Sequence, residues 1–222
     1  MRLLRVLAVA TGFAVLLSQA SAAQDTRQFK DAWFWGVKGG GMLYSSASTT
    51  GSAAPLVGAE WLITRTNGGL YVSFDQAFLS TTGGFIDHDT DSTFVRPVSL
   101  KNLRRFTMAA MAFPMQSRTL HPYAGAGLVF NQIAGAALLT GSTSSSNYLL
   151  AADSIQSKKT AFSPIFLAGV QARLRPMSVF GQVTASPTQE AFFLSNAGSS
   201  KFNFALEFGV RYNVGSSIDR AR

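Results

Sequence analysis

The sequence predicts an all-β fold, an eight-stranded antiparallel up-and-down β-barrel, from three observations. Eight segments place apolar side chains at every second position, which is the period of a strand with two unlike faces. The connections between these segments alternate between long and short. The composition, with 47% apolar and 14% charged residues, excludes a disordered chain, and 222 residues suffice for one barrel domain.

The last segment, residues 202–214, has the cleanest alternation. Its apolar positions are Phe202, Phe204, Leu206, Phe208, Val210, Tyr212 and Val214. The residues between them are small, polar or charged, so this segment predicts a strand with one apolar face. The same template predicts seven earlier strands, at residues 32–44, 56–64, 70–79, 104–113, 121–133, 162–174 and 178–185.

The connections predict how these strands are ordered. Three are short, at residues 65–69, 115–120 and 175–177, and the first of them contains the hairpin pair Asn67-Gly68. Four are longer and polar, at residues 45–54, 80–103, 141–159 and 186–200. Strict alternation of short turns and long loops is typical of membrane barrels that run up and down.

The N-terminus carries the features of a secretory signal peptide. Arg2 and Arg5 precede an apolar run over residues 6–17, and Ala20-Ser21-Ala22 offers a small-residue cleavage site. We therefore divide the chain into a signal peptide at 1–22, a periplasmic segment at 23–31, a barrel at 32–214 and a tail at 215–222.

The composition of the two faces predicts which one points outward. The polar faces carry mostly small and uncharged residues, which suit a filled interior, whereas a soluble barrel needs a charged exterior. The apolar faces carry aromatic residues suited to the girdles of a membrane barrel: Trp33, Trp35, Trp61, Phe106, Phe202 and Tyr212. A periplasmic, lipocalin-like carrier of an apolar ligand has the same alternation and is the alternative.

Seven charged residues fall on the inward faces in this interpretation: Lys38, Glu60, Asp75, Arg105, Arg173, Glu207 and Arg211. Buried charges persist when they are paired, so we expect a network of ion pairs in the lumen, with solvated charges at the rims as the alternative. An eight-stranded barrel encloses only its own side chains, which disfavours an open pore.

The last strand also carries the most specific motif, with Glu207, Gly209, Tyr212 and Val214 at the spacing of a barrel-assembly signal. With this motif the chain resembles the small eight-stranded outer-membrane barrel proteins, such as the transmembrane domain of outer-membrane protein A and the outer-membrane protein X-like barrels. The resemblance implies a bacterial outer-membrane location, insertion by the barrel-assembly machinery and a monomer. The tail after Val214 departs from the family, whose signals commonly end in Phe.

Residues able to carry chemistry are few. The chain lacks Cys and has two histidines, His88 and His121, neither of which is followed two residues later by the Ser of lipid A deacylase barrels. We expect no catalytic residues and no cofactor, with a lipid A-modifying enzyme built on one of these histidines as an alternative. Asp87, Asp89 and Asp91 form a weak candidate for a divalent-ion site, so we expect no metal centre.

Basic residues lie in or near the long connections, at Arg96, Lys101, Lys158, Lys159 and Lys201. Lipopolysaccharide phosphates match such cations, so we expect contacts with lipopolysaccharide and outer-membrane lipid. The net charge of +8 is scattered rather than clustered with aromatics, which disfavours nucleic acid as a partner. The predicted function is structural or surface-interacting: membrane integrity, adhesion or contact through loops.

Overall fold

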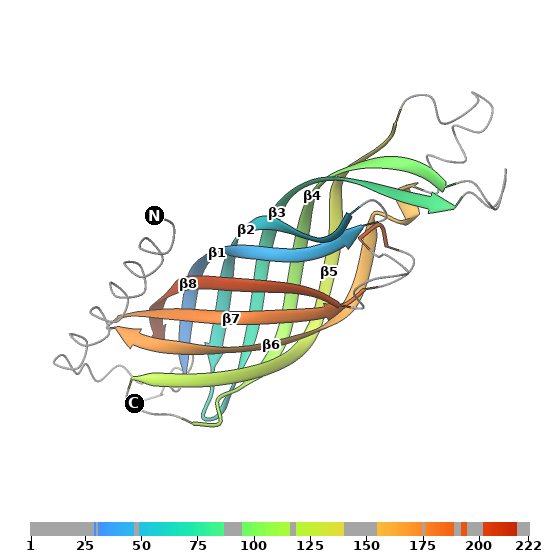
Figure 1. Cartoon of the computed structure of the whole chain (residues 1–222). Helices are drawn as coiled ribbons and strands as arrows, with labels where there is room; N and C mark the ends of the chain where they lie inside the picture. Colours follow the sequence, from blue (N-terminus) through green and yellow to red (C-terminus); the bar gives the residue numbers. More distant parts are fainter. Residues whose placement is uncertain are drawn as a thin grey trace, which may run out of the picture.

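The eight strands form one closed antiparallel barrel, in which each strand pairs with its neighbours in the chain and β8 closes onto β1 (Figure 1). The computed structural model describes residues 29, 31–46, 49–86, 95–115, 119–139, 155–174, 176–188, 192–194 and 202–216. The strands are β1 (Ala32–Ser46), β2 (Thr49–Thr64), β3 (Gly68–Ile86), β4 (Val95–Ala112), β5 (Leu120–Leu138), β6 (Thr160–Leu174), β7 (Met177–Pro187) and β8 (Phe202–Ser216). The predicted fold class, an eight-stranded up-and-down barrel, is confirmed.

Alternating burial along each strand follows the alternation in the sequence. In β8, Glu207 is fully buried, whereas its neighbour Phe208 is 53% exposed. The polar face thus points into the barrel and the apolar face points out, because successive side chains of a strand lie on opposite sides of the sheet. Among the described residues, no helix is long and apolar enough to cross a membrane.

Two of the predicted long connections are wrong in extent. Strand β1 extends to Ser46 and strand β2 already begins at Thr49, and the two residues pair with each other, inside the ten-residue loop expected at 45–54. Strands β3 and β4 continue pairing from Ser80–Lys101 to Ile86–Val95, inside the region expected to be a loop. Gly, Ser and Thr interrupt the alternation of apolar residues in both regions. The two-residue period therefore does not predict either extension.

Strands β3, β4 and β5 therefore reach past the rest of the barrel at the end with the long connections (Figure 1). The inner side of this extension packs on segments from two other connections. Leu79 and Leu100 belong to the same buried apolar cluster as Ile155, Phe193 and Leu194. These contacts between remote parts of the chain fill the barrel at this end.

The barrel interior consists of three levels. An apolar cluster at the short-turn end includes Phe34, Leu62 and Phe113, and the apolar cluster just described fills the opposite end. Buried charged residues occupy the level between them. Polar groups in the middle of the barrel are thus separated from both mouths by apolar side chains.

Candidate functional site

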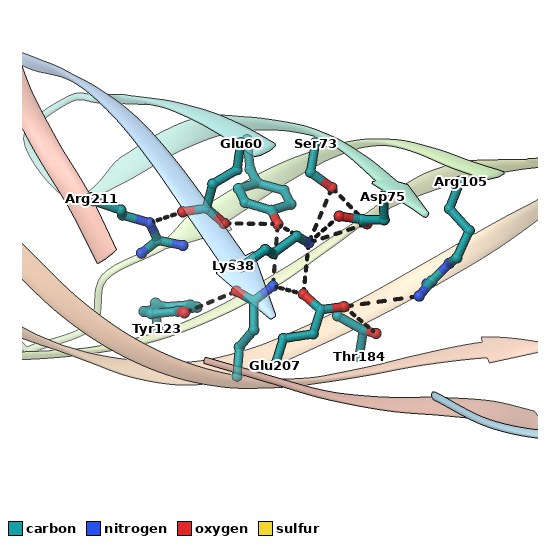
Figure 2. Close-up of polar contacts among 11 residues, drawn as sticks. Lys38, Glu60, Ser73, Asp75, Arg105, Tyr123, Thr184, Glu207 and Arg211 are labelled. Atoms are coloured by element: carbon teal, nitrogen blue, oxygen red, sulfur yellow. Dashed lines mark hydrogen bonds and ion pairs between the residues drawn. The ribbon is translucent and has the colours of Figure 1, made fainter. Parts of the chain in front are cut away.

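Lys38 lies at the centre of the polar level. Its Nζ is 2.9 Å from Asp75 Oδ1 and 2.7 Å from Glu207 Oε2, and all three side chains are about 1% exposed (Figure 2). The same ammonium donates hydrogen bonds to Tyr71 Oη at 2.8 Å and Ser73 Oγ at 3.3 Å. One cation from β1 therefore joins carboxylates of β3 and β8 across the lumen.

A second ion pair, between Arg211 and Glu60, lies beside this centre (Figure 2). Arg211 Nε donates to Glu60 Oε1, and Arg211 Nη1 donates to Gln171 Oε1 at 2.6 Å. The guanidinium carbon also lies 3.8 Å from the centroid of the Phe180 ring, a distance typical of a cation–π contact. Arg211 is therefore held on its edge by polar groups and on its face by an aromatic ring.

Two neutral side chains connect the pairs. Tyr71 donates to Glu60 Oε2 at 3.1 Å, and Gln182 Nε2 donates to Tyr71 Oη at 3.2 Å and to Glu207 Oε2 at 2.7 Å. Tyr123 in turn donates to Gln182 Oε1 at 3.0 Å. The two ion pairs are thus joined into one hydrogen-bonded network and are not independent of each other.

Arg105 lies at the far side of the network, with Nη1 3.9 Å from Glu207 Oε1 (Figure 2). Of the seven charged residues expected in the lumen, the structure brings six into this network: Lys38, Glu60, Asp75, Arg105, Glu207 and Arg211. Three are cations and three are carboxylates, so their charges balance. Arg173 lies outside it, half-buried near the short-turn end of β6 and paired across the sheet with Ser178.

Glycines on the inner face leave the space that these side chains occupy. A Cβ at Gly58 would overlap the Asp75 carboxylate, and a Cβ at Gly209 would lie 2.6 Å from the Phe180 ring that covers Arg211. The charged side chains therefore fit because the strand opposite or beside them carries no side chain at these points.

The mouth at the short-turn end is filled by Phe29, which is 5% exposed. Its ring stacks on His121 with centroids 4.3 Å apart and meets the Phe113 ring edge-on at 4.8 Å. Phe29, from the segment expected at 23–31, thus belongs to the interior. His121 is buried behind this ring.

Large apolar side chains are exposed on the outer wall of all eight strands. Among the expected girdle residues, Trp33, Trp35, Phe106, Phe202 and Tyr212 are between 38% and 54% exposed, and Trp61 is half-buried. Trp35 stacks on Trp61 with centroids 5.6 Å apart, in a row that continues to Tyr212 on β8. This row lies toward the short-turn end of the three strands.

The remaining predicted residues are placed as follows. Glu207 and Gly209 of the assembly motif point inward, while Tyr212 and Val214 point outward. Lys101 is exposed on β4, and Lys158 and Lys159 are half-buried next to β6. The side chain of Arg96 and all of Lys201, Asp87, His88, Asp89 and Asp91 lie outside what the structure describes. No group of three or more acidic or His residues that could hold a metal occurs in the described part of the chain.

Sequence reasoning missed the neutral members of the network, among them Tyr71, Tyr123, Gln171 and Gln182. Tyr71 lies between the outward residues Leu70 and Val72, so the alternation of the strand alone could have placed its side chain in the lumen. The contacts between inward residues depend on how all the strands are aligned around the barrel. The alternation within one strand does not give this register.

Comparisons with known proteins identify the fold. The structure is similar to the crystal structure of neisserial surface protein A, with a TM-score of 0.51 and 14% identity over 81% of this chain and 96% of that one. The chain has the fold of the small eight-stranded outer-membrane barrels. No protein-family model matches the sequence, and no curated protein matches it.

Two further solved structures are similar at lower scores. The attachment invasion locus protein Ail of Yersinia pestis has a TM-score of 0.46 and 8% identity, covering 83% of this chain and 99% of that one. The outer membrane protein OprG of Pseudomonas aeruginosa has a TM-score of 0.44 and 10% identity, covering 86% and 100%. At these scores and identities, neither structure supports a statement about the function of this chain.

Proposed function

We propose that this protein is a bacterial outer-membrane β-barrel without catalytic activity, with a structural or surface-interacting role. One observation carries the proposal: the polarity of the barrel is reversed relative to a soluble protein. Charged groups such as Lys38 and Glu207 are buried and paired, while Trp35, Phe74 and Phe208 are each more than half exposed. An exposed apolar wall of this extent requires lipid, because water disfavours large apolar patches.

The filled lumen narrows the range of roles. Apolar clusters occupy the levels near both mouths, and the charged network occupies the level between them. This arrangement argues against transport of a diffusing solute, because an eight-stranded barrel encloses little more than its own side chains. The outer wall and the long connections are then the surfaces available for membrane integrity, adhesion or contact with other molecules.

The two alternatives are disfavoured by the same interior. A periplasmic carrier of an apolar ligand needs an apolar cavity within a charged exterior, which is the reverse of the arrangement described. A lipid-modifying enzyme built on His121 needs access for a substrate, yet the Phe29 ring stacks on that imidazole. His88 lies outside the described residues.

The proposal includes export and assembly. The segment 1–22 directs export as a cleaved signal peptide, and the barrel-assembly machinery recognises Glu207, Gly209, Tyr212 and Val214 on the last strand. The ends of β1 and β8 near Trp33 and Val214 then face the periplasm, and the long connections face the cell exterior, as in barrels with short periplasmic turns.

Fractionation of expressing cells tests the proposal. The membranes are separated on a sucrose gradient, and the outer-membrane fraction is run on a denaturing gel with and without boiling. We expect the protein in that fraction, with a folded band whose mobility changes on boiling. A soluble periplasmic protein with one mobility would contradict the proposal and favour the carrier.

A further inference from the structure

The apolar wall is interrupted by two cations on β4, Lys101 and Arg104. Among the strand residues whose side chains the structure describes, these are the only charged ones that are exposed. No ion pair within the described part of the chain involves either residue. The described wall therefore presents positive charge at one place and no exposed carboxylate.

A backbone irregularity at Asn102, opposite the register shift between Ala77 and Ser80 on β3, brings both cations to the same face. Residues three apart in a regular strand point to opposite faces, yet Lys101 and Arg104 both point outward while Leu100 and Leu103 are fully buried. Asn102 has a φ of 55°, in the left-handed region that Asn tolerates better than most residues, and the register with β3 shifts here. The backbone irregularity thus concentrates charge on the outer wall.

Neighbouring strands add neutral hydrogen-bonding groups beside the cations. Arg104 pairs across the sheet with the partly buried Gln76 on β3 and with the exposed Gln132 on β5. Lys101 pairs with Gly135, which carries no side chain beside the lysine. Two amide side chains and one glycine therefore lie next to the two cations.

An aromatic row borders this polar patch on the side of the barrel middle. Phe74, Phe106 and Phe130 pair with one another on β3, β4 and β5, and they are 52%, 44% and 40% exposed. Arg104 lies two residues before Phe106 on the same face, on the side of this row nearer the long connections. The patch therefore lies where the apolar wall gives way to the extended part of the sheet.

We propose that Lys101 and Arg104, with Gln76 and Gln132, bind the phosphate of a lipid headgroup in the outer leaflet. Lipid A has phosphates of this kind. The inference rests on the membrane insertion proposed above. A cation on a lipid-facing wall is costly without a counter-ion, and the guanidinium fork of Arg matches two phosphate oxygens at once. In the proposed orientation this part of the wall lies at the level of the outer headgroups.

Binding of purified lipid A tests the site. Folded protein in octyl glucoside micelles is titrated with diphosphoryl lipid A, with lipid A from which both phosphates have been removed, and with inorganic phosphate, and bound lipid is measured by native mass spectrometry. We expect the diphosphoryl form to bind best. The Lys101→Gln and Arg104→Gln double variant should bind it roughly tenfold more weakly, as expected for lost charge-assisted hydrogen bonds.

Arg65→Gln is the matched control, because it removes an exposed arginine in the turn at the opposite end of the barrel. It should bind diphosphoryl lipid A like the unmodified protein. Unchanged binding by the double variant, equal binding of the dephosphorylated lipid, or inorganic phosphate binding as tightly as the lipid would each overturn the site. Heat-modifiable mobility, recorded for every variant, separates failure of this site from failure of membrane insertion.

Discussion

Lys38 and Glu207 are 169 residues apart in the sequence, yet their side chains meet at 2.7 Å where the first and last strands close the barrel. Lys38 pairs across the sheet with Gly209, and Glu207 pairs with Gly40. The ion pair that centres the polar network therefore spans the same seam that joins β1 to β8. Closure of the barrel and satisfaction of the buried charges depend on each other.

Removing the ammonium of this pair should destabilise the folded barrel strongly. Lys38→Met leaves the carboxylates of Asp75 and Glu207 buried without their main cation, and we expect a loss of about 3–5 kcal/mol in the free energy of unfolding. Urea unfolding in detergent micelles, followed by tryptophan fluorescence, measures it. The control Val37→Ala changes the neighbouring outward residue, and equal stabilities of the two variants would refute the role of the network.

Substitution of an inward glycine should also impair folding, because backbone and ring atoms occupy the space. In Gly209→Ala the new methyl group meets the carbonyl of Val37 and the Phe180 ring, so we expect slower refolding and a lower urea midpoint. Gly39→Ala is the matched control, since its nearest atom is 3.7 Å away. A Gly209→Ala barrel that refolds like Gly39→Ala would show that the interior can repack.

The filled lumen predicts an absence of conductance. In planar bilayers the inserted protein should give no stepwise current, because apolar side chains fill both ends and the charged network fills the middle. Phe29→Ala removes the ring at one mouth but leaves the middle level intact, so that variant should also remain closed. Regular channel openings by the unmodified protein would mean that the interior rearranges in a bilayer.

The positions of the strands could be predicted where inward and outward side chains alternate regularly between polar and apolar types. The burial pattern of β8 follows the alternation from Phe202 onward, since one face meets the lumen and the other is exposed. The extensions of β3 and β4 were not predictable, because Gly83 and Gly84 carry no side chain to show a period. Their inner side is covered by Phe193 from a remote connection, which no local pattern reveals.

The charged residues of the candidate site could be predicted from the sequence, but the hydrogen bonds that join them could not. The alternation of the strands predicts Glu60 and Arg211 in the lumen, because a charged residue between apolar ones lies on the polar face. It could not show that Tyr71 and Gln182 join the ion pairs, since that depends on the register of strands distant in sequence. The positive φ at Asn102, where the alternation of β4 changes face so that Lys101 and Arg104 both point outward, likewise cannot be predicted from a strict alternation.

The central claim is that the apolar face of the barrel contacts lipid, and tryptophan quenching tests it most directly. All three tryptophans, Trp33, Trp35 and Trp61, lie on the outer wall near the short-turn end. In vesicles of phospholipids brominated on their acyl chains, we expect blue-shifted emission that is strongly quenched, with little quenching by aqueous acrylamide. Emission insensitive to bromine but quenched by acrylamide would contradict the account, because the aromatic face would then be in water.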